Sequence, residues 1–270
     1  MRFTLLGSGC CRCDLDRWGP AQVLEIGGEI LLFDCGRGAT MRMQQAGIPF
    51  QDIRDVFFTH HHYDHNCDFI YFFLTGWLMG RQEPLRIYGP RGTERFVRSL
   101  FDVALADDIA SRREHPIFSE NGWRREVLDV VDPVWEHQGG GWTLSAIHTV
   151  HMAPHLDNLA YKIQAEGKTV VIAGDNIVCD NLMDFAQDAD LLVHECTFPS
   201  DRIKRANWER FHTPPRDLGR WARERNVKRL LIRHFAVQDG VAVEPMAAEV
   251  REEFGDEGLL VGRDLMVVDI

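Results

Sequence analysis

Histidine and aspartate residues that could bind metal crowd into one short stretch, residues 60–65, which reads HHHYDH. His60 and His62 are two residues apart, so in extended backbone their side chains point to the same side and can grip one ion. A tight turn after them would bring Asp64 and His65 toward a second ion nearby. Imidazole and carboxylate ligands suit zinc, iron, manganese or cobalt, and this stretch does not select among them. The spacing therefore predicts a site for divalent metal.

The stretch alone leaves the ligand shell of two ions incomplete. Its middle residue, His61, falls on the opposite side of the backbone and is not expected to bind. Candidates that could complete the shell stand at the ends of later apolar runs: His151, Asp175 and His234, with His148 as a competitor for His151. A histidine-rich surface tract is the alternative reading, but the strand context and the intercalated aspartate argue against it.

Short strands are expected to position these residues. Residues 56–59 form a β-type apolar run that delivers the histidines where the strand gives way to a loop. Residues 22–26 and 29–33 are two apolar runs separated by a pair of glycines, which predicts a tight hairpin. Further strands are predicted at residues 85–88, 142–150, 160–165, 169–173, 191–193 and 229–233.

Helices alternate with these strands. Apolar residues at helical spacing predict a helix over residues 96–104. Thr213 is predicted to be an N-cap, with Pro214 in the first turn of a helix that runs through residue 222. A final helix and a hairpin of residues 259–261 and 265–268 are expected to close the chain. Strands mixed with helices predict a layered α/β sandwich.

Composition bounds the class of protein. The chain has 270 residues, of which 45% are hydrophobic and 26% charged, without repeats or linkers, so we expect one domain over 1–270. The formal net charge of −11 argues against a long nucleic acid as partner. The start lacks a leader pattern and no apolar run is long enough to span a bilayer, which predicts a cytoplasmic protein without a membrane partner. Seven cysteines, an odd number, fit reduced thiols.

The HHHYDH stretch matches the HxHxDH signature of the metallo-β-lactamase superfamily, and the chain resembles its ribonuclease Z branch. Supporting segments follow in the order of the family: residues 6–9, 32–36, 85–93, His151, Gly174 with Asp175, and residues 194–197, 211–213 and 230–234. The resemblance implies a four-layer αββα sandwich, of mixed α/β (α+β) class, with two metal ions in a groove between the edges of the sheets.

The resemblance also implies a role for each residue of the site. It assigns the ligands as His60, His62 and His151 for one ion, Asp64, His65 and His234 for the other, and Asp175 as the bridge. Asp64 could in addition orient the nucleophile. Glu195 and His212 match a pair in which the histidine assists the leaving group and the glutamate orients the histidine. The alternative for this pair is a histidine at a helix start and a buried acid that binds an arginine.

Several positions depart from the family pattern. The segment after His151 is longer and more polar than usual, so His155 and Asp157 either touch substrate at the pocket mouth or cap a turn. The long basic Gly/Pro-rich arm that ribonuclease Z proteins use to hold tRNA is missing, which favours a smaller substrate. Cys10, Cys11 and Cys13 could bind a structural zinc, although their spacing fits reduced thiols better. The apolar stretch 69–77 is expected to pack in the core, and its inner end could line the pocket.

Together these features predict a hydrolase that uses two divalent metal ions, zinc with manganese or iron as alternatives, to activate water. The predicted substrate is a small-molecule ester, with a phosphodiester favoured. The alternatives are an arylsulfate, a lactone or a thioester. A di-iron redox protein of the same fold is less favoured, because the sequence has no flavodoxin-like extension. Dimers are common in the branch, which leaves a homodimer open.

Overall fold

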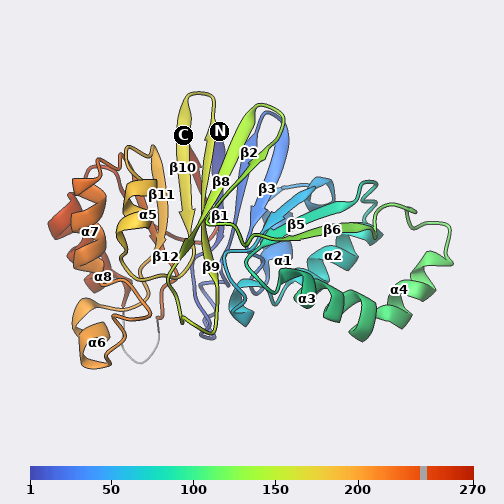
Figure 1. Cartoon of the computed structure of the whole chain (residues 1–270), viewed down its shortest axis with the longest axis horizontal. Helices are drawn as coiled ribbons and strands as arrows, with labels where there is room; N and C mark the ends of the chain where they lie inside the picture. The colour runs from blue at the N-terminus through green and yellow to red at the C-terminus, as the bar shows by residue number, and fades with distance from the viewer. Residues whose placement is uncertain (238–241) are drawn as a thin grey trace.

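A computed structural model describes residues 1–237 and 242–270 of the chain. Two seven-stranded sheets lie face to face, and helices cover their outer faces (Figure 1). The first sheet has the strand order β14 (Met266–Asp269), β1 (Arg2–Gly7), β2 (Ala21–Ile26), β3 (Glu29–Phe33), β4 (Asp55–Phe57), β5 (Leu85–Gly89), β6 (Arg125–Asp129). The second has the order β13 (Leu259–Val261), β12 (Leu230–Arg233), β11 (Leu191–Glu195), β10 (Lys168–Ala173), β9 (Asn158–Ala165), β8 (Trp142–Thr149), β7 (Val134–Gln138).

The helices divide between the two outer faces, as Figure 1 shows. The first sheet is covered by α1 (Ala39–Ala46), α2 (Phe69–Leu78), α3 (Thr93–Arg98), the wide turn η3 (Ser99–Ala104) and α4 (Ala106–Arg113), and the second by α5 (Asp180–Phe185), α6 (Ser200–Arg205), α7 (Pro215–Glu224) and α8 (Val243–Phe254). Two single-turn helices, η1 (Phe50–Asp52) and η2 (Tyr63–His65), stand in loops. This arrangement confirms the predicted αββα sandwich. Within the described residues, no helix is both long and apolar enough to cross a bilayer.

Aromatic rings fill the space between the sheets. The rings of Phe33 and Phe57 stack with centroids 5.0 Å apart, and Tyr88 stacks on Phe57 at 5.1 Å. Tyr161 reaches across from the second sheet, contacts Phe57 edge-on at 5.5 Å, and donates a hydrogen bond of 2.6 Å to the backbone oxygen of Phe58. The buried tyrosine thus satisfies its hydroxyl at the strand that leads to the histidine stretch.

Parallel strands bring distant parts of the chain to one edge. In the first sheet β3 runs parallel to β4, and in the second sheet β10, β11 and β12 run parallel to one another. Because the carboxyl ends of parallel strands meet at the same edge, the residues that follow them become neighbours. Asp34 and His60 follow β3 and β4, while Asp175 and His234 follow β10 and β12. This edge therefore carries the predicted ligands.

Most predicted elements are confirmed. The glycine pair joins β2 and β3 in an antiparallel hairpin, and Gly27 and Gly28 adopt positive φ of 57° and 88°. The expected helix over residues 96–104 is present, although it starts at Thr93 and ends in the wider turn η3. The prediction of one domain over 1–270 stays a prediction.

The predicted C-terminal hairpin is wrong. β13 pairs in parallel with β12 of the second sheet, whereas β14 pairs antiparallel with β1 of the first. The chain crosses between the sheets: the amide of Gly262 donates to Ile232, and the amide of Leu265, at φ 62°, donates to Leu5. Two short apolar runs predict strands but not their partners, and both sheets offered an open edge here.

The predicted start of α7 is also wrong. The helix begins at Pro215 and its N-cap position is Pro214, which makes no side-chain cap. The Thr213 hydroxyl instead donates a 2.8 Å hydrogen bond to the backbone oxygen of Asn176, in the loop that follows β10. Thr213 therefore ties the start of α7 to the loop that carries Asp175.

Candidate metal centre

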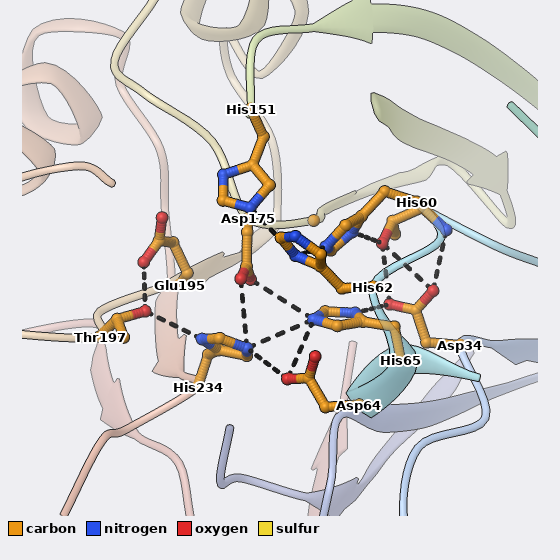
Figure 2. Close-up of polar contacts among 12 residues, drawn as sticks. Asp34, His60, His62, Asp64, His65, His151, Asp175, Glu195, Thr197 and His234 are labelled. Atoms are coloured by element: carbon orange, nitrogen blue, oxygen red, sulfur yellow. Dashed lines mark hydrogen bonds and ion pairs between the residues drawn. The ribbon is translucent and has the colours of Figure 1, made fainter. Parts of the chain in front are cut away.

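Four of the predicted ligands form one tight group. The donor atoms of His60, His62, His151 and Asp175 all lie within 4.8 Å of one another. His62 Nδ1 is 3.0 Å from His60 Nε2 and 3.2 Å from His151 Nε2, so three ring nitrogens converge on a single point (Figure 2). This is the arrangement that a divalent cation requires of its ligands.

The remaining predicted ligands form a second group. Asp64, His65 and His234 also place their donor atoms within 4.8 Å of one another. The Nε2 atoms of His65 and His234 are 3.3 Å apart, and Asp64 Oδ2 lies 3.4 Å from His234 Nε2. His234 holds its ring there with a left-handed φ of 66°, a backbone strain that is typical of functional positions.

Asp175 lies between the two groups. It belongs to the first group, yet its Oδ2 is 3.2 Å from His234 Nε2 and its Oδ1 is 3.6 Å from His65 Nε2 (Figure 2). Its side chain is buried, and Oδ1 accepts no hydrogen bond within the described part of the chain. A buried carboxylate oxygen without a donor fits a position that faces a cation. The residues present therefore fit a pair of divalent ions.

Burial and nearby charges shift the pKa values of several histidines in this site. Burial lowers the pKa of His60 and His151, and it lowers that of His62 to about 4, so these rings are neutral at pH 7 and offer a lone pair. His65 differs: burial lowers its pKa, but the carboxylates of Asp34, Asp64 and Asp175 outweigh burial and raise it to about 9. A metal ion that binds His65 would replace this proton.

Hydrogen bonds on the far side of the rings fix their direction. Asp34, fully buried, contacts His65 Nδ1 at 2.9 Å and accepts from the amide of Thr59 at 2.8 Å. The Thr59 hydroxyl in turn lies 3.0 Å from His60 Nδ1. Thr197 contacts His234 Nδ1 at 2.9 Å. Such outer partners set the tautomer and orientation of metal-binding histidines.

These orienting residues were not predicted. Asp34 stands in the family-like segment 32–36, at the end of a strand, and this position was the signal that could have identified it. Thr197 follows the predicted Glu195 by two residues and gave no signal of its own, since a threonine near a strand end is ordinary.

The predicted pair of Glu195 and His212 is in contact. His212 Nδ1 lies 2.9 Å from Oε1 and 3.0 Å from Oε2 of the fully buried Glu195. Burial lowers the pKa of His212, but the charge and hydrogen bond of Glu195 outweigh it and raise the pKa to about 9. His212 therefore carries a proton at neutral pH. Its ring is 5.4 Å from that of His151, beside the first ligand group.

Other sequence candidates lie outside the two groups. His61 Nε2 contacts the Thr93 hydroxyl at 2.7 Å, which agrees with its expected exclusion. His148 contacts the backbone oxygen of Asp132 at 3.1 Å, so His151 is the histidine that joins the site. Asp157 pairs with Arg91 at 3.2 Å on the surface, and the His155 amide closes a turn, so neither lines the pocket.

A cavity of about 420 Å³ opens over both groups. Five candidate ligands line it: His62, Asp64, His151, Asp175 and His234. The other lining residues are Cys10, Cys11, Arg12, Tyr63, Met152, Thr197, Phe198, Trp208, Phe211 and His212. The expectation that the stretch 69–77 lines the pocket is wrong: that stretch forms α2, whose buried rings pack against the outer face of the first sheet. Cys10, Cys11 and Cys13 form no disulfide, and they join neither ligand group among the described residues.

Comparisons with known proteins agree with this fold and site. Residues 1–228 match the family described as Anti-Pycsar protein Apyc1. A ribonuclease Z of Mycobacterium bovis (strain BCG / Pasteur 1173P2) is 30% identical over 282 residues, which cover 100% of this chain and 98% of the relative. The chain belongs to the ribonuclease Z-like branch of the metallo-β-lactamase superfamily, within the family described as Anti-Pycsar protein Apyc1. It is thus a metal-dependent hydrolase of the phosphodiesterase type.

Solved structures of the superfamily show the same architecture. The metallo-β-lactamase fold protein YhfI from Bacillus subtilis superposes with a TM-score of 0.76 at 20% identity, over 99% of both chains. Human tRNase Z, short form, superposes with a TM-score of 0.74 at 24% identity, over 100% of this chain and 99% of that one. At these identities the likeness shows a shared fold.

Membership of the ribonuclease Z-like branch corrects one expectation. The net charge argued against a long nucleic acid as partner, but the relatives matched over the whole chain are named for ribonuclease activity. Net charge is an average over the surface and does not describe the neighbourhood of the site. Two arginines lie against rings that line the pocket: Arg202 over Phe198 and Arg210 over Phe211.

The carboxylate of Asp34 provides a test of the candidate centre. We expect Asp34→Asn to weaken zinc or manganese binding about 10- to 100-fold, because the amide no longer fixes His65 in the ligand tautomer. Competition with a chromogenic chelator measures this affinity. Asp55→Asn is the matched control, since Asp55 is also buried but pairs with Arg86 at the start of β4. Equal metal affinity in the Asp34 variant and the native protein would contradict this role.

Proposed function

We propose that this protein hydrolyses a phosphodiester bond with the help of two divalent metal ions, zinc being the first choice. In this proposal His60, His62 and His151 would hold one ion, Asp64, His65 and His234 would hold the other, and Asp175 would bridge them. The contact between His212 and Glu195, directly beside these groups, carries the proposal. It adds a proton donor to a site that can activate water.

When bound, two divalent ions would lower the pKa of water to about 7 and polarise a phosphoryl oxygen. The chain's own residues supply the rest. Asp64 would orient the attacking water, which would lose one proton to solvent as its oxygen forms the new bond to phosphorus. The bond between phosphorus and the leaving oxygen breaks, and that oxygen takes the proton from Nε2 of His212. Glu195 holds Nδ1 of the same ring, so only Nε2 is free to donate.

The proton donor favours phosphodiesters over the other esters considered. An alkoxide such as a ribose oxygen is a poor leaving group, and general-acid catalysis contributes about 10²- to 10⁴-fold to such a step. Arylsulfates release a stabilised phenolate and gain little from a donor. A lactone or thioester remains compatible with the metal site alone, without a role for His212 and Glu195.

The volume of the cavity limits the size of the substrate that can enter it. A volume of about 420 Å³ lies in the range of small-molecule pockets and accommodates a phosphate with one nucleoside. A small phosphodiester would fit entirely. An RNA would place one nucleotide inside and the rest across the surface, and the ribonuclease Z relatives favour RNA as a second candidate.

A panel of esters tests the proposal. Protein would be chelated, reloaded with zinc or manganese, and offered bis-p-nitrophenyl phosphate, 3′,5′-cyclic nucleotides, an RNA oligonucleotide, p-nitrophenyl sulfate and a lactone. We expect metal-dependent turnover of the phosphodiesters, lost in Asp64→Ala and kept in the control Asp157→Ala. Cleavage of RNA alone would establish the second candidate. Turnover of the sulfate or lactone without any phosphodiester would overturn the proposal.

The role of His212 predicts a pattern across substrates and pH. His212→Ala should keep its metal content and slow turnover about 10²-fold or more for alkyl diesters, but much less for nitrophenyl diesters. Because the acid must be protonated, native kcat should fall as pH rises through about 9, where His212 loses its proton. The variant should lack this alkaline limb. Equal turnover of native protein and variant on alkyl diesters would remove His212 from the mechanism.

A further inference from the structure

Aromatic side chains form one wall of the cavity, and neither the metal site nor the proton donor accounts for them. Phe198 and Trp208 lie with ring centroids 4.8 Å apart, and both line the pocket. Phe198 also meets the His212 ring edge-on at 5.7 Å. The aromatic wall therefore stands on the side of the pocket from which the proton is donated.

The two rings of this wall pack against a small hydrophobic cluster. Phe198 is buried in a small cluster with Cys10, Ile203 and Ala236, against which Trp208 packs. The guanidinium of Arg202 sits 4.9 Å from the centre of the Phe198 ring. Trp208 is partly exposed and presents an aromatic surface to the cavity. The local cluster explains why Phe198 is held, but not why Trp208 faces the pocket.

Backbone hydrogen bonds connect Trp208 to His212, the proposed proton donor. The carbonyl oxygen of Trp208 accepts hydrogen bonds from the amides of both Phe211 and His212, at 2.8 and 2.9 Å. The amide of Trp208 is held in turn by the carbonyl of Ile203 at 2.9 Å. One turn thus sets the distance between the indole ring and His212. If the leaving oxygen lies beside His212, the group attached to that oxygen would lie against the indole ring of Trp208.

From these contacts we infer that Trp208 and Phe198 form a nucleobase-binding subsite for the leaving group. The inference rests on the proposed phosphodiester hydrolysis. It adds which side of the phosphate carries the nucleoside: the nucleoside is the leaving group, and its oxygen takes the proton of His212. Bases stack on tryptophan through their π-face, whatever their hydrogen-bonding edge, so the subsite selects a flat aromatic group and not a particular base. The adjacent basic residues, Arg202 and Arg210, suit an anionic nucleotide.

Binding of nucleotides that contain no phosphodiester tests the subsite separately from hydrolysis. Metal-loaded protein would be titrated with adenosine and uridine monophosphates, and with ribose 5-phosphate as the ligand without a base. We expect Trp208→Ala to weaken nucleotide binding on the order of tenfold or more, with ribose 5-phosphate unaffected. Trp208→Phe should keep most of the affinity. Nucleotide-induced fluorescence quenching should vanish in Trp208→Phe and persist in Trp135→Phe, because Trp135 does not line the pocket.

Kinetics on two diesters add a second readout. In Trp208→Ala, KM for a nucleoside phosphodiester should rise about tenfold with kcat little changed, while an alkyl diester without a base is turned over as by the native protein. Equal loss for nucleotide and ribose phosphate, or native nucleotide affinity in the variant, would overturn the subsite. If no phosphodiester is hydrolysed yet Trp208 still governs nucleotide binding, the proposed function fails and the subsite stands.

Discussion

The buried carboxylate of Asp175 is the constraint on which the rest of this structure depends. It sits between two groups of imidazoles, and one of its oxygens has no hydrogen-bond donor in the described part of the chain. Burying an uncompensated carboxylate is costly, so cationic charge must be supplied from both sides. Histidines from the two sheets face it, and His65 and His234 lie within 3.6 Å and 3.2 Å of its oxygens.

The direction of the strands brings these histidines to Asp175. Strands of the two sheets end at a common edge, and the loops after β4, β8, β10 and β12 carry the candidate ligands there. Residues behind them, Asp34 and Thr197, fix the rings by hydrogen bonds from buried positions. The same edge holds Glu195, at the end of β11, which orients His212. This frame thus places His212, an aromatic wall and candidate ligands around one cavity.

Local sequence was enough to predict which candidate ligands the structure brings together. The stretch HHHYDH and the strand-end residues His151, Asp175 and His234 carry their chemistry in residue type and spacing, and the structure brings them together. The pocket wall was not predictable in this way, since Phe198, Trp208 and Phe211 differ little from core residues until the loops are folded. The pairing of β13 and β14 failed for a related reason: a short apolar run shows its strand character but not its partner. The partner prediction failed because net charge is an average over the whole surface and says nothing of any one site.

Metal stoichiometry of the Asp175→Asn variant tests the central claim most directly. Native protein loaded with zinc should hold two ions per chain, measured by mass spectrometry of the intact folded protein and by metal analysis. If Asp175 joins the two groups, the amide variant should bind both ions more weakly, since each group loses the same charged ligand. A native protein that holds one ion, or a variant that keeps two at native affinity, would contradict the account.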